Sequence, residues 1–314
     1  MIEKIELHAH GEVQGLYSLR VGEISEAGSE VNCYAPVPPF ANLITNVGLE
    51  RMGDNSDWLR RTYVGSGSAA PSVNDTAMGN FVASTETFQE NTSGSQSAAP
   101  YYTWVRITRR FAAGQAAGNL SEVGIGWADS LFSRALILDA EGSPTTISVG
   151  ADQFLDVTYE FRFYPKTTDD TGTVTLTGSV GGTYDYIFRS SSVTSNSITQ
   201  GWTVSSSGTN MGDRGSSSFT SRRAYNGNIG TITGMPNGTT DSINNPVLAY
   251  EAGSLRRKFV TGAGLNEANL TGGIRSVFLR MGIGAFQIQF DPPIPKTDQT
   301  VLSLEVSHSW GRRA

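Results

Sequence analysis

One alternating stretch near the middle of the 314-residue chain recurs near its end. Across residues 155–163, apolar side chains take every second position and polar side chains fill the positions between them. A period of two predicts a strand with one buried face, because a shift by one residue would bury the polar groups. The chain should therefore contain two related strand modules. Their matching positions, in order, are Ile147, Leu155, Val157, Tyr159, Phe161 and Phe163 in the first and Ile294, Leu302, Leu304, Val306, His308 and Trp310 in the second.

The composition of the chain favours short strands joined by many turns. Glycine supplies 36 of the 314 residues, 38% of the residues are apolar and 17% are charged, which is typical of a globular protein. Glycine, serine and asparagine are common in turns, and the chain is long enough to form two hydrophobic cores. We therefore predict an all-β fold of two duplicated, β-sandwich-like antiparallel domains with long Gly/Ser-rich loops.

At most one short helix is expected, near residues 41–52. Leu43, Val47 and Met52 fall at roughly helical spacing, and Gly53 stands where a helix C-cap is expected.

The predicted domain boundary lies at residues 166–172, whose charged residues, threonines and glycine are typical of an interdomain connection. The first domain then covers residues 1–165, although its opening segment up to Gly28 alternates only weakly. The second domain, residues 173–314, is expected to be a diverged copy of the first. The similarity between the two halves extends upstream of the alternating stretches. Arg110-Phe111 and Asn119-Leu120 in the first half correspond to Lys258-Phe259 and Asn269-Leu270 in the second.

Charge and hydropathy disfavour two classes of partner. The net charge of -6 provides no basic field that would gather phosphates, so nucleic-acid binding is not expected. The chain has no apolar run long enough to span a bilayer, and its first residues lack the pattern of a signal peptide. We expect synthesis in a cytoplasm and no membrane insertion.

The sequence offers few residues for metal or nucleophile chemistry. His8 and His10 would share one face of a strand, but a third metal ligand is missing nearby and His308 is distant in sequence. The single cysteine, Cys33, excludes an intrachain disulfide and is expected to be a small apolar filler. Nucleophile-elbow, zinc-protease and phosphate-loop motifs do not occur. We expect no metal, no cofactor and no enzymatic activity.

Paired carboxylates leave one alternative open. Glycoside cleavage needs two acids that are close in space but can be distant in sequence. Asp139 and Asp291 follow similar strand ends in the two modules, where an Asx-type turn accounts for them without chemistry. A carbohydrate-binding or carbohydrate-cleaving β-sandwich protein therefore stays as the alternative function. The candidate acids are Glu122, Asp139, Asp152, Asp156 and Asp291.

Exposed contacts are expected at two tryptophans and two loops. Trp127 and Trp310 follow strand alternation and should lie in the core, whereas Trp58 and Trp202 adjoin polar loops. Residues 65–76 are expected to form a long ordered loop or tip, and the polar loop at residues 205–218 has a length that is usually functional or disordered. The predicted subunit or receptor contacts are Trp58, Trp202, Gly65, Ser66, Gly67, Ser205, Ser206 and Ser207.

Several short motifs fall in the first half of the chain. They are FANLITNVGL at residues 40–49, YVGSG at 63–67, AP at 70–71, DTAMG at 75–79, NLSEVG at 119–124 and LFSRA at 131–135. With these motifs the chain resembles a broad group of tailed-bacteriophage virion proteins, often labelled tail fibre, tail-tip or minor structural proteins. The second half shares the resemblance through the duplication, but replaces the Phe-Ser-Arg element with Met281-Gly282-Ile283-Gly284.

The resemblance implies a structural role in a virion tail, in the tail tip, baseplate or a fibre, and supplies no active-site residues. It also implies assembly with other tail proteins, a homo-oligomer such as a trimer or hexamer, and contact with a host surface receptor or glycan. On this interpretation the protein is made in the bacterial cytoplasm and ends in the virion tail.

Overall fold

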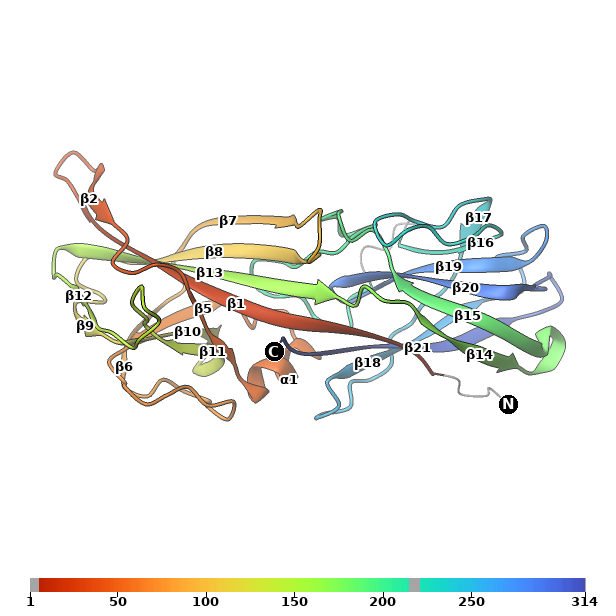
Figure 1. Cartoon of the computed structure of the whole chain (residues 1–314), viewed down its shortest axis with the longest axis horizontal. Coiled ribbons are helices and arrows are strands. Elements are labelled where there is room, and N and C mark those ends of the chain that lie inside the picture. The colour runs from red at the N-terminus through yellow and green to blue at the C-terminus, as the bar shows by residue number, and fades with distance from the viewer. Residues whose placement is uncertain (1–5, 215–220, 314) are drawn as a thin grey trace.

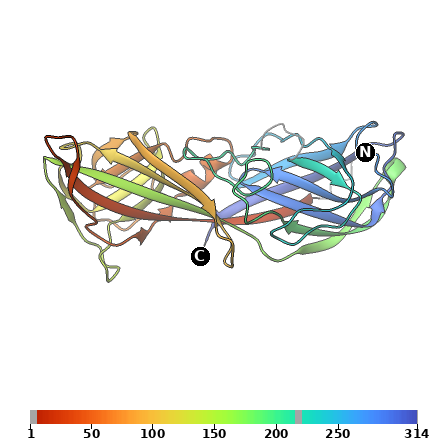
Figure 2. The same cartoon turned by 90° about the horizontal axis from the view of Figure 1, so that it is seen from above.

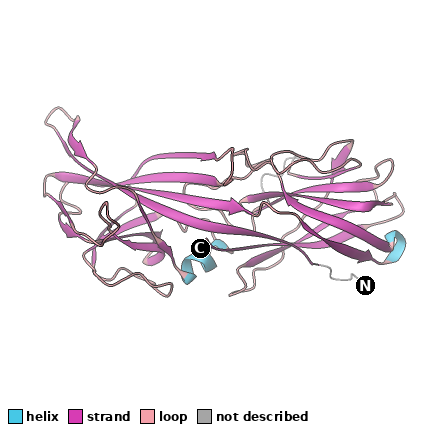
Figure 3. Ribbon diagram, in the orientation of Figure 1, coloured by secondary structure: helices cyan, strands magenta, loops and turns pink. Residues whose placement is uncertain are grey.

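The structure, a computed structural model, describes residues 6–214 and 221–313. These residues form 21 strands, one α-helix and one 3-10 helix, so the predicted all-β class is confirmed (Figure 3). The strands build an elongated molecule with two lobes (Figure 1). Seen from above, the red N-terminal strand, β1 (Glu6–Ile24), crosses the centre where the lobes meet (Figure 2).

Strand β1 has different neighbours along its two halves. Residues 11–23 pair antiparallel with β13 (Gln153–Pro165). Residues 6–13 pair in parallel with β21 (Leu302–Arg312) on the other edge of β1. One continuous strand therefore belongs to both lobes, and its pairing with β21 is parallel where only antiparallel sheets were predicted.

The side chains of β1 alternate strictly between buried and more exposed positions across residues 7–21. The sequence shows this only weakly because Gly11 and Gly15 hold two of the inward positions. An added Cβ would lie 2.1 Å from Phe163 Cε1 at Gly11, and 2.1 Å from the Tyr159 hydroxyl at Gly15. Aromatic rings from β13 occupy the space that these two glycines leave.

The first lobe is a sandwich of two sheets. Its strands besides β1 and β13 are β2 (Glu30–Tyr34), β3 (Phe40–Ala41), β4 (Leu43–Ile44), β5 (Arg61–Gly65), β6 (Phe81–Thr85), β7 (Phe88–Ser95), β8 (Thr103–Phe111), β9 (Gly118–Leu120), β10 (Glu122–Trp127), β11 (Ser130–Leu136) and β12 (Ile147–Val149). One layer contains β1-β13-β8-β7 with β2 and β3 along β1, and the other is the five-stranded sheet β4-β11-β10-β5-β6. Strands β9 and β12 pair separately. The Phe132 ring of β11 packs between the layers, 5.9 Å from the Phe161 ring of β13.

The second lobe repeats the two-layer arrangement. Its strands besides β21 are β14 (Asp170–Leu176), β15 (Gly182–Ser190), β16 (Arg222–Tyr225), β17 (Thr240–Ser242), β18 (Arg256–Ala263), β19 (Ile274–Met281) and β20 (Gly284–Ile294), with a 3-10 helix at Gly178–Val180. One layer contains β18-β21 and the start of β1, and the other is the six-stranded sheet β14-β15-β20-β19-β16-β17. Phe286 of β20 meets His308 of β21 with ring centroids 4.8 Å apart.

The single α-helix, α1 (Asn46–Met52), lies within the range predicted for it. Its N-cap is Thr45, whose side-chain oxygen accepts a hydrogen bond from the Gly48 amide at 2.9 Å. Gly53 is the C-cap, as the sequence predicts.

The two repeated stretches both lie beside β1, but each pairs with its other neighbour in a different register. Strands β13 and β21 flank β1, and each has an antiparallel partner, β8 or β18. Phe111 of β8 lies opposite Leu155, whereas Phe259 of β18 lies opposite Val306. The sequence echo equates Leu155 with Leu302, four positions before Val306, so the two strand pairs differ in register.

The division into domains at residues 1–165, 166–172 and 173–314 stays a prediction. Residues 170–172 of the predicted linker begin β14. The hydrogen bonds between β1 and β21 also join residues 6–13 of the first predicted domain to the second. A cut at residues 166–172 would therefore separate β21 from one of its neighbouring strands.

Candidate binding site

Both tryptophans that were expected to make exposed contacts are buried. Trp58 is 0% exposed and Trp202 is 1% exposed, so their predicted exposure is wrong. The polar loops beside them in the sequence fold back, and residues distant in sequence cover their rings. Trp310 lies in the core as predicted, and Trp127 is half-buried with the Arg51 guanidinium carbon 5.1 Å from its ring centroid.

The loop at residues 205–209 covers Trp58. The Trp58 indole N–H donates to the Thr209 carbonyl at 3.3 Å. Gly208 has φ +114°, and an added Cβ there would lie 2.6 Å from the Trp58 ring. This loop therefore joins the two lobes of one chain, and residues 215–218 of the predicted contact segment lie outside the described residues. The predicted contact side chains of the loop are exposed at Ser205 and Ser207 and half-buried at Ser206.

Trp202 anchors a second junction between the lobes. Its ring centroid lies 5.6 Å from that of Phe163 in β13 and 5.3 Å from that of Phe286 in β20. Its indole N–H donates to the Ser191 carbonyl at 3.0 Å. A large flat ring with one polar group is suited to such a place, because it buries much area and satisfies its single donor.

Gly65, Ser66 and Gly67 begin an ordered tip, the loop between β5 and β6 (Figure 1). The amides of Gly67 and Asn80 both donate to Glu122 Oε1, at 3.0 and 2.7 Å. The Ser66 hydroxyl accepts from Asn80 Nδ2 at 2.6 Å. Gly65 and Gly67 are buried and Ser66 is exposed, so only Ser66 presents a side chain outward.

A buried ion pair holds this tip. Glu122 is 0% exposed, and its Oε2 accepts from Arg134 Nε at 2.6 Å. Arg134 also donates to Asp75 Oδ2 at 2.8 Å and to the Ala69 carbonyl at 2.9 Å. Burial raises the pKa of Glu122, but backbone amides, that of Asn80 first, and the Arg134 guanidinium lower this pKa below its ordinary value. An ionised Glu122 is unsuited to be the proton donor of glycoside cleavage.

Two further candidate acids have structural partners. Asp139 Oδ1 accepts from the amides of Glu141 and Ser143 at 3.0 and 2.8 Å, so the Asx-type turn predicted there is confirmed. Asp291 lies inside β20 and bonds Arg275 at 2.9 Å, so the turn predicted there is wrong. The strand continues through Asp291 because residue 185 of β15 pairs with it.

Asp156 lies between two arginines. Its carboxylate accepts from Arg20 at 3.0 Å and from Arg110 at 2.6 Å, whereas Asp152 is exposed.

A second Arg20 nitrogen donates to Cys33 Sγ at 3.0 Å. Cys33 is exposed on β2, so its predicted position as an apolar filler is wrong. All five residues of β2 are exposed, which leaves no core for Cys33 to fill.

The three histidines do not converge on one point. His8 and His10 share a face of β1, where each ring Nδ1 lies 2.8 Å from a serine hydroxyl of β21, Ser307 or Ser309. The β1–β21 register places His308 opposite residue 9, and its ring is buried among aromatic side chains. Within residues 6–214 and 221–313, no group of three His, Cys, Asp or Glu side chains is placed to hold a metal ion.

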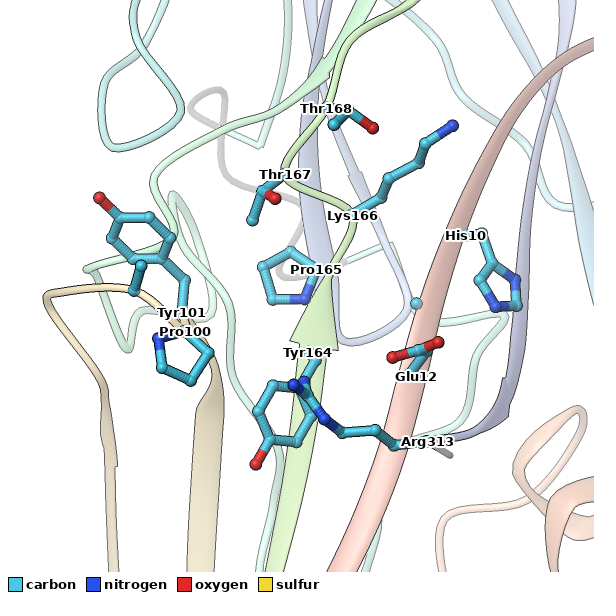
Figure 4. A pocket seen from close by; sticks show the side chains of 12 residues that line it. His10, Glu12, Pro100, Tyr101, Tyr164, Pro165, Lys166, Thr167, Thr168 and Arg313 are labelled. Atoms are coloured by element: carbon cyan, nitrogen blue, oxygen red, sulfur yellow. The ribbon is translucent and has the colours of Figure 1, made fainter.

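A cleft of about 680 Å³ lies at the junction of the lobes (Figure 4). Four segments build it: β1, the turn between β7 and β8, the connection from β13 to β14, and the residues after β21. Its lining side chains are His10, Glu12, Ala99, Pro100, Tyr101, Tyr164, Pro165, Lys166, Thr167, Thr168 and Arg313, with Gly11 between the first two.

The cleft combines charge with aromatic surface. The Arg313 guanidinium carbon lies 3.8 Å from the Tyr164 ring centroid, and the Lys166 amide donates to the His10 carbonyl at 3.3 Å. Burial lowers the pKa of His10, although Glu12 acts in the opposite direction. Two cationic side chains, one carboxylate and two tyrosines suit a polar chain segment better than an apolar ligand. This cleft is the candidate binding site.

Sequence reasoning missed this cleft because it treated residues 166–172 as a linker. The cleft forms only where four segments meet, and each is more than 60 positions from the next along the sequence. The turn at residues 99–101, where Ala-Pro-Tyr follows a polar stretch, was the one local signal available.

No family model, curated protein or solved structure matches this chain. In the part of the chain that the structure describes, no helix is long and apolar enough to cross a membrane.

Proposed function

We propose that the protein is a structural component of a bacteriophage tail, in the tail tip, baseplate or a fibre. In this role it assembles with other tail proteins as a homo-oligomer and contributes to host attachment. The motifs of the first half suggest this group, and a set of exposed apolar side chains on the first lobe carries the proposal.

Among the described residues, six of the ten exposed large apolar side chains belong to the first lobe. Phe81 is 58% exposed and Phe88 50% exposed, within one short segment that leads from β6 into β7. Large apolar side chains that are exposed on one lobe are candidates for contact with another protein chain. The six are Ile24, Val31, Tyr34, Phe81, Val82 and Phe88.

The contacts of the candidate acids favour a structural role of the protein over a catalytic one. Glu122, Asp139, Asp156 and Asp291 each bond an arginine or a turn amide, so their carboxylates serve the fold. Carbohydrate cleavage requires one protonated and one ionised acid beside a substrate, and the pKa of Glu122 lies below its ordinary value.

Immunogold labelling tests the proposal directly. Antibodies raised against the purified protein are applied to virions from lysates of cells that carry its gene. We expect gold particles on the tail, at its tip or along a fibre. Label on the capsid alone, or no label on particles that otherwise look complete, would overturn the proposal.

A double variant, Phe81→Ser with Phe88→Ser, tests the contact surface. The control is Val301→Ser, which is equally exposed, at 60%, but lies in the second lobe. We expect the double variant to keep its melting temperature and to lose incorporation into tails or adsorption to cells. Normal tails and adsorption in the double variant would remove this surface from the proposal.

A further inference from the structure

A second cavity, with a volume of about 490 Å³, lies beside the loop that covers Trp58. The loop contributes hydroxyl and amide groups to it, and two strands of the second lobe contribute arginines, Arg257 from β18 and Arg280 from β19. Its polar lining includes Ser205, Thr209, Asn210, Asp213, Arg257 and Arg280.

Arg280 is 0% exposed and uses only part of its guanidinium within the chain. Its Nη1 donates to the carbonyls of Gly201 and Ile283, the latter at 2.9 Å. Among residues 6–214 and 221–313, its Nε and Nη2 have no hydrogen-bond partner. These two nitrogens form the edge of a guanidinium that donates two parallel hydrogen bonds to a carboxylate. The edge of the Arg280 guanidinium that suits an anion is therefore the edge formed by Nε and Nη2.

Arg257, which is 6% exposed, adds a further unused donor to the same cavity. Its Nε has no hydrogen-bond partner in the part of the chain that the structure describes. Its Nη1 lies 3.5 Å from Asp54 Oδ1, and its guanidinium carbon lies 5.5 Å from the Tyr250 ring centroid. An unmade hydrogen bond is costly for a buried donor, and more so when the group is charged. Two such arginines at one cavity point to an occupant that supplies acceptors.

The charges of the lining select the kind of anion. Two arginines and one aspartate, Asp213, line the cavity, and the exposed Asp54 also pairs with Arg257, so a monoanion suits the site better than a dianion. Burial lowers the pKa of Arg280 to about 10, so its guanidinium is still protonated at neutral pH. The Ser205 hydroxyl already donates to the Gly208 carbonyl, so the groups around the arginines that can meet ligand hydroxyls are the Thr209 hydroxyl and the Asn210 side-chain amide.

We propose that this cavity binds a hydroxylated carboxylate of the sugar-acid class, with the carboxylate on Nε and Nη2 of Arg280 and a further hydrogen bond from Arg257. The volume is within the range of small-molecule sites. The same chemistry is present in a free sugar acid and in the terminal residue of an acidic glycan. This inference does not rest on a role in a phage tail.

Calorimetric titration of the full chain with glucuronate, methyl glucuronide, glucose and inorganic phosphate tests the proposal. We expect glucuronate to bind and glucose, which lacks the carboxylate, not to bind. Binding of methyl glucuronide as well identifies a glycan end as the source, whereas binding of the free acid alone identifies a free metabolite. Equal binding of glucose, tighter binding of phosphate, or no binding of glucuronate would overturn the proposal.

Variants assign the binding to the arginines. Arg280→Met and Arg257→Gln should each weaken glucuronate binding at least about tenfold, because each removes a charged donor. Arg109→Met is the matched control, since Arg109 is also buried, has two nitrogens without a partner within residues 6–214 and 221–313, and does not line this cavity. Unchanged affinity in folded Arg257→Gln would contradict the proposal even if Arg280→Met does not fold. Tail labelling tests the other proposal separately, so the two can fail independently.

Discussion

The imidazole of His308 lies in one of the most apolar parts of the second lobe. Its ring is 0% exposed and packs against Phe286 and Phe163. Within residues 6–214 and 221–313 neither nitrogen makes a hydrogen bond of good geometry, although the Met281 backbone lies close enough to oppose the lowering of the pKa. Burial, followed by the nearby His8 and His10, lowers the pKa of His308 from 6.5 to about 3. Folding therefore selects the neutral ring.

Replacing His308 with Phe should make the protein less sensitive to acid. Between pH 6.5 and about 3 the unfolded chain binds a proton that folded His308 does not, so its contribution to stability falls as the pH falls through this window. The loss is on the order of 3 kcal/mol at pH 4. Urea unfolding from pH 7 to pH 4 should show a growing advantage of His308→Phe over the wild type. Parallel stability curves for the two proteins would contradict this account.

Two buried arginines should respond in opposite ways to the same substitution. Arg134→Met should cost about 3 kcal/mol or more, because it leaves Glu122 buried without its cation. Arg109→Met should be neutral or stabilising, because Nε and Nη1 of Arg109 are buried and have no hydrogen-bond partner among the described residues. Free energies of unfolding from urea titrations at pH 7 give both values. A larger loss in Arg109→Met than in Arg134→Met would reverse the assignment.

At the scale of the element, β1 is shaped by its neighbour β13. Its inward glycines leave space that the rings of Tyr159 and Phe163 fill. The burial pattern of β1 therefore depends on pairs of facing residues, one in β1 and one in β13. The sequence of β1 alone shows only one residue of each pair.

Gly15→Ala should destabilise the protein although alanine normally costs less than glycine in a strand. The new Cβ would meet the Tyr159 hydroxyl at 2.1 Å, and overpacking of this kind costs about 1–3 kcal/mol. Ser18→Ala, on the more exposed face of the same strand, is the control and should change stability little. Thermal melting of both variants makes the comparison. Equal melting temperatures would show that β13 moves to accept the methyl group.

At the scale of the whole molecule, the two lobes share β1 and bury each other's tryptophans. Trp58 of the first lobe is bonded to Thr209, and Trp202 packs on Phe163 at the end of β13. The lobes are therefore expected to stabilise each other.

A fragment of residues 173–314 should fail to fold alone, because it lacks the β1 segment that pairs with β21. We expect a poorly dispersed proton NMR spectrum and no cooperative melting transition. Addition of a peptide of residues 6–13 should restore part of the structure by supplying the missing strand. A fragment that folds cooperatively without the peptide would show that the predicted boundary separates independent domains.

The sequence alone determined the features that depend on neighbours along the chain. The alternation at residues 155–163 and 302–310 specified strands, because a shift by one residue would bury charge. The helix and its Gly53 cap followed from local spacing. The turn at Asp139 was also predictable, because a side chain that bonds amides two and four residues later needs no distant partner.

Only the tertiary structure decided what covers each residue. Trp58 adjoins polar residues in sequence, yet it is buried by a carbonyl and a glycine about 150 positions away. The cleft at the lobe junction and the two arginines of the second cavity are likewise assembled from separate segments. Burial depends on which surfaces meet after folding. A local sequence pattern indicates that a side chain needs a packing partner, but not which residue that partner is.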